Sequence, residues 1–136
     1  MSGIEAWRAN VIAALYNLNE QRREGGRAYE IMEEGVVQRG NLVGTHLRLM
    51  LRSGFMDVYV YDDTSVEAHI YLSAPTPEEV EKVAGAVEGT VMKNSLQIPY
   101  VFVSVSRAAD EKTAAERILA LADRVSELME KELVAV

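Results

Sequence analysis

The sequence predicts an α+β fold in which a helical N-terminal segment precedes a three-stranded, mainly antiparallel sheet with two helices. Three observations lead to this class. Apolar residues recur at helical spacing near the N-terminus, and runs of alternating Val, Ile and Tyr follow Gly54. Two segments in the same part of the chain combine a helix N-cap with apolar residues at helical spacing. The predicted order of elements is α-α-α-β-β-α-β-α.

The chain has the size and composition of one ordinary domain, with 136 residues, 49% of them hydrophobic and 26% charged. We expect a single domain over 1–136, with 1–53 as a helical arm or subdomain and 54–136 as the sheet-plus-helices core. The sequence contains no cysteine, which excludes disulfide frameworks and thiolate chemistry. It also lacks a signal-peptide pattern and a long apolar run, so we expect a cytoplasmic protein without a membrane partner.

The net charge of −7 is divided unequally along the chain. Residues 1–53 contain seven Arg and six acidic residues, a net charge of +1, whereas residues 54–136 carry −8. An acidic total disfavours nonspecific binding to phosphate backbones, although the Arg-rich N-terminal part leaves room for a local basic stripe.

The first helix is predicted to run from Ser2 to about residue 22. Ser2 and Glu5 have the spacing of a capping box. Apolar residues then recur on one face at Ile4, Trp7, Val11, Leu15 and Leu18. Two further helices are predicted over 27–34 and 41–52, each ended by a glycine.

Two alternating runs, 55–62 and 66–73, predict a β-hairpin joined by an Asp- and Thr-containing turn. The segment 76–79, Thr-Pro-Glu-Glu, has the pattern of a capped helix start. The apolar face of that helix is predicted to consist of Val80, Val83, Ala84, Val87 and Val91. A third strand over 100–105 and a closing helix capped by Asp110 complete the fold.

The hairpin register is predicted from the segregation of its two faces. A three-residue loop over 63–65 places the apolar side chains on one face, whereas a slip of one residue would mix the two sides. The predicted pairs are Val60 with Ala68, Val58 with Ile70, and Met56 with Leu72. The valines of the third strand, Val101, Val103 and Val105, extend this apolar face, and the two C-terminal helices cover it.

The opposite face then gathers most of the aromatic side chains, and we predict it to be a ligand-binding or interface surface. Its predicted members are Phe55, Asp57, Tyr59, Tyr61, Glu67, His69, Tyr71, Tyr100 and Phe102. An aromatic patch of this size needs a cover. Three covers are open: the chain's own N-terminal helices, a second copy in a homo-oligomer, or a small molecule or peptide. RNA is disfavoured, because these members include two carboxylates and no Lys or Arg.

The order α-β-β-α-β over 41–106 resembles that of KH-type RNA-binding domains and of small ferredoxin-like regulatory domains. A KH domain requires a GxxG loop, and no two glycines of this sequence have that spacing. No site residue is carried over from either family.

A winged-helix DNA-binding domain has the same order of elements as the predicted helices 27–34 and 41–52 followed by the hairpin 55–72. The polar stripe of its second helix would consist of Asn41, Thr45, Arg48 and Arg52. Two features oppose this interpretation. The tip of the wing would contain Asp62 and Asp63, which repel phosphate, and the winged-helix fold lacks the extra strand at 100–106. It is kept as the alternative function.

The only imidazole groups belong to His46 and His69. Arg39 and His46, with six residues between them, resemble the ribonuclease motif of HEPN-type helical nucleases, which implies action on a scissile phosphate. His69 has Asp57 and Glu67 on the same predicted face, as a general base or a metal ligand would. No catalytic residue, metal or cofactor is predicted.

The leading prediction is a non-enzymatic α+β module that forms homo-oligomers, either as a scaffold or as a ligand-responsive regulatory module. The alternative is a winged-helix-like transcriptional regulator that binds DNA. A small-molecule ligand is compatible with the leading prediction, and nucleic acid is a partner only in the alternative.

Overall fold

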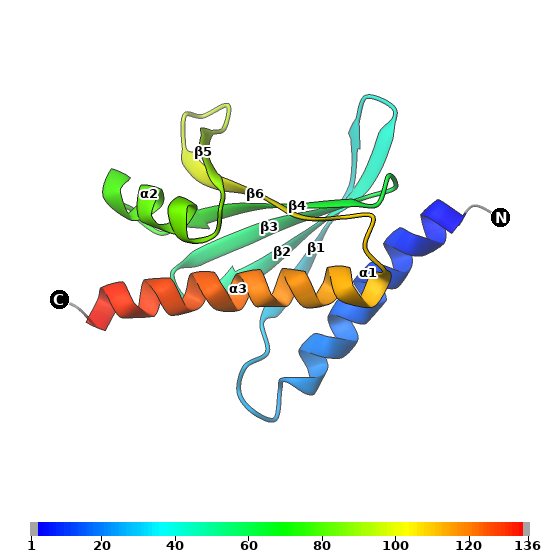
Figure 1. Ribbon diagram of the computed structural model, residues 1–136, viewed down its shortest axis with the longest axis horizontal. Coiled ribbons are helices and arrows are strands. Elements are labelled where there is room, and N and C mark those ends of the chain that lie inside the picture. The colour runs from blue at the N-terminus through cyan, green and yellow to red at the C-terminus, as the bar shows by residue number, and fades with distance from the viewer. Residues whose placement is uncertain (1–2, 135–136) are drawn as a thin grey trace.

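The computed structural model describes residues 3–134, so Ser2, the predicted cap of the first helix, lies outside the described residues. Within this range the fold consists of three helices and one six-stranded antiparallel sheet (Figure 1). The helices are α1 (Gly3–Gln21), α2 (Pro77–Ala86) and α3 (Glu111–Val134). The strands are β1 (Glu30–Arg39), β2 (Leu42–Leu51), β3 (Gly54–Tyr61), β4 (Ser65–Leu72), β5 (Thr90–Lys93) and β6 (Pro99–Arg107). The α+β class is therefore confirmed, but the predicted three-stranded sheet is wrong.

The strands lie in the order β1-β2-β3-β4-β6-β5. The first four follow one another as a meander, and β6 then pairs with β4 while β5 adds to the outside of β6. Helices α1 and α3 lie across one face of the sheet, and α2 packs at its β6–β5 end (Figure 1). The ends of the β1–β2 hairpin and of the β5–β6 connection rise on the side away from α1 and α3.

The largest correction concerns the segments 27–34 and 41–52, which are predicted as helices but contain the strands β1 and β2. Gly40 has a φ of +63° in the two-residue turn that joins them, a conformation typical of tight hairpins. Gly44 is needed for close packing, because a Cβ there would lie 2.5 Å from Cδ1 of Tyr61. These glycines shape a hairpin rather than weaken a helix, so 1–53 is not a helical arm.

The second correction concerns the end of α2 and the strand that follows. The capping box of Thr76 and Glu79 is confirmed, with the amide of Glu79 donating to Oγ1 of Thr76 over 3.2 Å. The helix ends at Ala86, however, so the predicted continuation to Val91 is wrong. Gly89 donates its amide to the carbonyl of Ala84 over 2.8 Å, a bond typical of helix C-termini, and β5 begins directly afterwards.

The predicted register of the β3–β4 hairpin is wrong by two residues. Val60 pairs with Val66 and Val58 pairs with Ala68, and the turn occupies 62–64. A shift of two residues leaves every side chain on its original side of the sheet. The apolar face is therefore found where the alternation predicts it.

This apolar face, the core face, is covered by the helices. Its fully buried members from the strands are Leu47, Leu49, Met56, Val58, Val60, Val66, Ala68, Ile70 and Val101. From the helices, the same cluster includes Val11 and Leu15 of α1, Val83 of α2, and Ile118 and Val125 of α3. The indole of Trp7 donates to the carbonyl of Ala109 over 2.9 Å and so connects α1 to the start of α3.

Candidate binding face

The other side of the sheet, which we call the aromatic face, carries the residues that alternate with those of the core face. The structure places all nine predicted residues there: Phe55, Asp57, Tyr59, Tyr61, Glu67, His69, Tyr71, Tyr100 and Phe102. Strands β1 and β2 extend it with Met32, His46, Arg48 and Met50. Among residues 3–134, α1 packs on the core face instead. The chain's own N-terminal helix therefore does not cover the aromatic face.

The rings of the aromatic face form one continuous network. His46 stacks on Tyr59 with centroids 4.5 Å apart, and Tyr59 contacts His69 at 4.7 Å. His69 stacks on Tyr100 at 4.7 Å, and Tyr100 meets Tyr71 at 5.2 Å. Phe55, Tyr61 and Phe102 complete the network at its margins. Ring pairs in such geometries contribute more than their buried area alone.

Two arginine–carboxylate pairs lie between the rings. Arg48 donates to both carboxylate oxygens of Asp57, at 2.8 and 3.3 Å, and its guanidinium lies 4.0 Å from the centroid of Phe55. Arg39 donates to Oε1 of Glu67 over 2.7 Å. Asp57 is 5% exposed and Glu67 is 9% exposed, so both carboxylates are largely desolvated without a covering layer of helices. Paired, hydrogen-bonded charges are the form in which burial is tolerated.

Both histidines lie on the aromatic face, next to these carboxylates. Nε2 of His46 is 3.1 Å from Oδ1 of Asp57, and Nε2 of His69 is 3.5 Å from Oε1 of Glu67. Neither nitrogen is aligned for a hydrogen bond, although both atoms are buried. Among the described residues, no group of three His, Cys, Asp or Glu side chains has the arrangement of a metal site.

Burial changes the acidity of several groups on this face. Burial is the main reason why the pKa values of Tyr59 and Tyr61 are each raised to about 12, with the carboxylate of Asp57 adding to the effect at Tyr59 and that of Glu67 at Tyr61. Burial also acts to raise the pKa of Glu67. The interactions of its carboxylate with His69, Arg39 and Tyr61 are stronger than this effect of burial, so the pKa of Glu67 is lowered. The contact from Arg39 is better formed than that from His69, whose ring N–H is out of line.

Methionines line both margins of the ring network. Met32 and Met50 lie on the β1–β2 side and are 42% and 37% exposed, and Met92 lies on the β5 side and is 43% exposed. The β5–β6 connection adds two further exposed apolar side chains, Leu96 and Ile98. Exposed methionines are common on surfaces that adapt to a partner, because the thioether chain is flexible and polarisable.

The residues of the winged-helix alternative do not form one stripe. Asn41 is in the β1–β2 turn, and Thr45 turns toward the core side, where it accepts a hydrogen bond from Arg8 over 3.3 Å. Arg48 is bound to Asp57 on the aromatic face, and Arg52 follows β2 and lies 3.7 Å from Glu130. The recognition helix that the alternative requires is a β-strand.

The nuclease-like pair is also divided between different partners. Arg39 ends β1, where it pairs across the hairpin with Leu42, and its guanidinium is bound to Glu67. His46 pairs across the hairpin with Gly35 and lies beside Asp57. Both residues are on strands, whereas the resemblance implies a helical nuclease.

A hollow of about 390 Å³ opens at one end of the aromatic face. Its lining includes the guanidinium groups of Arg39 and Arg107 together with Tyr61, Glu67 and Phe102. The end of β1, the end of β6 and the β3–β4 turn meet there. Two arginines, two carboxylates and two aromatic rings therefore lie together in this hollow.

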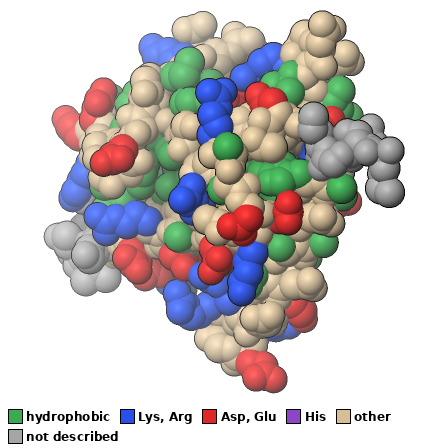
Figure 2. Space-filling view, turned by 45° about the vertical axis from the view of Figure 1, so that its right-hand side comes forward, with side chains coloured by type: hydrophobic (Ala, Val, Ile, Leu, Met, Phe, Trp, Pro, Cys, Tyr) green, Lys and Arg blue, Asp and Glu red, His purple; other side chains and the backbone are tan. Residues whose placement is uncertain are grey.

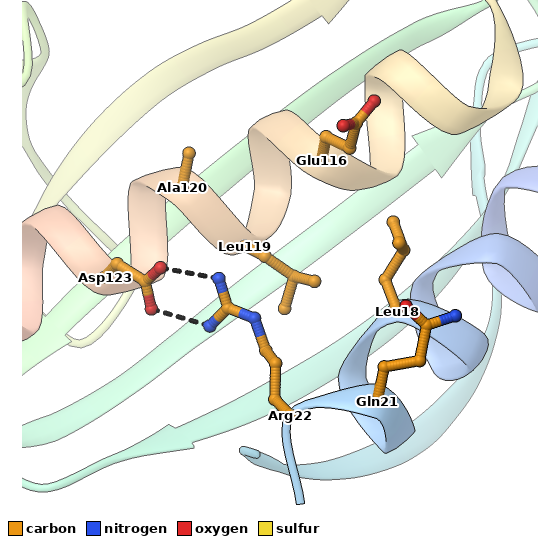
Figure 3. A pocket seen from close by; sticks show the side chains of 7 residues that line it. All are labelled: Leu18, Gln21, Arg22, Glu116, Leu119, Ala120 and Asp123. Atoms are coloured by element: carbon orange, nitrogen blue, oxygen red, sulfur yellow. Dashed lines mark hydrogen bonds and ion pairs between the residues drawn. The ribbon is translucent and has the colours of Figure 1, made fainter. Parts of the chain in front are cut away.

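A second hollow, of about 550 Å³, lies between α1 and α3 (Figure 3). Arg22 reaches across it and donates to both carboxylate oxygens of Asp123 over 2.8 and 2.6 Å. Tyr29 also donates to Asp123, over 2.6 Å. These hydrogen bonds to Asp123 connect α3 to the end of α1 and to the segment that leads into β1. In the space-filling view of Figure 2, acidic and basic side chains are interspersed over the surface.

Comparison with known proteins yields no match: no family model, curated protein or solved structure is significantly similar to this chain. None of the helices in residues 3–134 is long and apolar enough to cross a membrane.

Proposed function

We propose that the protein is a self-associating interaction module in which the aromatic face of one copy docks on the aromatic face of a second. The observation that carries this proposal is a ring network with methionine margins that α1 and α3 leave uncovered, because both pack on the core face. Aromatic and methionine side chains are enriched in protein interfaces. Face-to-face packing of two antiparallel sheets is a common way to bury such surfaces.

The size of the aromatic face suits a stable dimer. Six strands that average about eight residues, spaced ~4.8 Å apart with ~3.3 Å per residue, present roughly 750 Å². A stable protein interface of standard size buries ~800 Å² on each partner. A second copy of the same face therefore provides a cover of the right extent.

The charge distribution favours a second copy over a charged partner. The chain carries −7 in total, which makes most contacts between two copies repulsive. On the aromatic face, however, Arg39 and Arg48 neutralise Glu67 and Asp57. Two copies can approach here with less repulsion than through other surfaces, because these two carboxylates are already paired and largely desolvated.

DNA binding remains an untested prediction, and we do not propose it. Residues 41–52, which were expected to form its recognition helix, contain β2, and Arg48 is engaged within the sheet.

The proposal is tested by the mass of the protein in solution, measured by light scattering after size-exclusion chromatography. We expect about twice the 15.1 kDa of one chain. Met50→Lys and Met92→Lys place unpaired charge on the aromatic face and should shift the mass toward that of one chain. Tyr16→Lys is the matched control, because Tyr16 has the same 37% exposure as Met50 but lies on α1.

Emission from Trp7, the only tryptophan, reports the fold independently, since this residue is buried between α1 and the start of α3. A wild-type mass of one chain at every soluble concentration contradicts the proposal. So does an equal loss of association in the Tyr16 variant.

A further inference from the structure

The sheet has two edges that differ greatly in length. β5 forms one edge with four residues, whereas β1 forms the other with ten. Nearly all of β1 is exposed or half-exposed, and Val36 is 74% exposed. A long exposed edge strand presents unpaired backbone donors and acceptors to which another strand can add.

The geometry of the β1–β2 hairpin shows which backbone groups point outward. In a two-residue hairpin the residues that flank the turn, here Arg39 and Leu42, form a hydrogen-bonded pair, and the pairs then alternate. Gln38 and Val43 therefore form a pair without mutual hydrogen bonds. The carbonyl of Val43 indeed turns toward β3, where it accepts from the amide of Asp62 over 2.9 Å. By the same alternation, the amides and carbonyls of Gln38 and Val36 point to the open edge.

The open edge is acidic on both sides of the sheet. Glu33 lies on the helix side, where it adds to the effect of burial in raising the pKa of Tyr16. Glu34 lies on the side of Arg48, whose pKa it raises in addition to the larger effect of Asp57. The basic residue of β1, Arg39, is already bound to Glu67. A strand that adds here therefore meets negative charge at both faces, interrupted by the apolar side chain of Val36.

We propose that the β1 edge binds an extended segment of another protein in which Lys or Arg alternates with apolar residues, by adding it as a seventh strand beside the six. Backbone hydrogen bonds from Val36 and Gln38 provide the pairing. Because successive side chains of a strand point to opposite faces, the basic residues of the segment lie on the side of Glu34 and its apolar residues on the side of Val36. A second copy is a poorer occupant, because pairing of two β1 strands sets the acidic edge of one copy, with Glu30, Glu33 and Glu34, beside the same acidic edge of the other. This site uses the edge of the sheet and does not depend on the aromatic face.

The test uses a fluorescent peptide of alternating lysine and valine with the ten-residue length of β1, and binding to the full chain is followed by anisotropy. An alternating glutamate–valine peptide of equal length is the control and should not bind. Val36→Pro removes the outward-pointing amide donor of residue 36 without breaking a hydrogen bond between β1 and β2. It should weaken peptide binding by about tenfold or more. Val36→Thr keeps that amide and should bind within about threefold of wild type, because it alters only one exposed side chain.

A double variant, Glu33→Gln with Glu34→Gln, separates pairing from charge. It should weaken binding of the basic peptide and reduce the dependence of binding on salt. Loss of binding in this double variant together with unchanged binding in Val36→Pro would mean surface adsorption and overturns the proposal. Equal binding of the glutamate peptide also overturns it.

Self-association is read out separately from peptide binding. If Val36→Pro lowers the mass of the protein itself while the wild type ignores the basic peptide, the edge belongs to contacts between copies and the proposal is wrong. The proposed dimer through the aromatic face is judged instead by Met50→Lys, which leaves the outward groups of β1 in place. Trp7 emission verifies the fold of each variant.

Discussion

The two faces of the sheet are buried by different means. On the core face, aliphatic side chains such as Leu47 and Val58 are completely buried by three helices. On the aromatic face, carboxylates such as Asp57 reach almost the same burial with no helix above them, because the rings and guanidinium groups around them exclude water. The core face holds the fold together through nonspecific packing. The aromatic face keeps a directional polar network at a surface that is free to meet a partner.

The largest expected effect is at alkaline pH, since the aromatic face carries Tyr59 and Tyr61, whose pKa values are each raised to about 12. Tyr29, which donates to Asp123 on the helix side, has a pKa raised to the same value and contributes separately. Because the folded protein favours the protonated phenols, their contribution to stability is complete below the ordinary pKa of 10 and is lost as pH rises toward 12. Urea unfolding at stepwise alkaline pH, with phenolate absorbance, measures this loss. The Tyr59→Phe, Tyr61→Phe double variant should reduce the pH dependence and leave the part that Tyr29 contributes. An unchanged slope would show that these tyrosines are not its source.

A large loss is also expected from a cavity in the core face. Leu47→Ala removes a fully buried side chain beneath the helices and should lower the free energy of unfolding by about 3 kcal/mol. Urea denaturation at neutral pH provides the measurement. A decrease below about 1 kcal/mol would contradict the view that the helices pack tightly on this face.

A smaller loss is expected from the polar network. Asp57→Asn keeps the size of the side chain but weakens the hydrogen bonds of Arg48, and should lower the free energy of unfolding by about 2 kcal/mol. Glu127→Gln, which changes an exposed carboxylate of α3, is the control and should have little effect. If both variants behave alike, the network does not stabilise the aromatic face.

The smallest effect concerns an ion pair outside both faces. Arg52 and Glu130 are 3.7 Å apart and both largely exposed, so Arg52→Ala should change the free energy of unfolding by less than about 0.5 kcal/mol. Thermal unfolding compared with wild type tests this. A larger loss would show that the turn between β2 and β3 is held to α3 more firmly than surface charges allow.

Alternation predicted the faces of β3, β4 and β6 because one side is almost wholly apolar. It also runs through β2, where Leu47 and Leu49 alternate with His46 and Arg48. The prediction missed that signal because it placed 41–52 in a helix and gave no structural role to Gly40 and Gly44. The left-handed turn at Gly40 is local, whereas the role of Gly44, close contact with the ring of Tyr61, depends on a residue that is distant in the sequence.

The candidate site was only half visible in the sequence for the same reason. Its nine predicted residues come from strands that were recognised, whereas His46, Arg39 and Arg48 come from the unrecognised hairpin. Without β2 beside β3, nothing in the sequence brings Arg48 to Asp57. The prediction that the face lacks Lys and Arg was therefore wrong, because each carboxylate has an arginine partner.

The contact between Trp7 and Ala109 has a consequence for how the protein is made. Helix α3 is synthesised after every strand, so part of the core face of the completed sheet stays uncovered until α3 emerges from the ribosome. The anchor for the indole is translated at Ala109, more than 100 residues after Trp7 itself. Maturation must therefore wait for the C-terminal stretch, and a prematurely stopped translation product would be a substrate for aggregation and proteolysis.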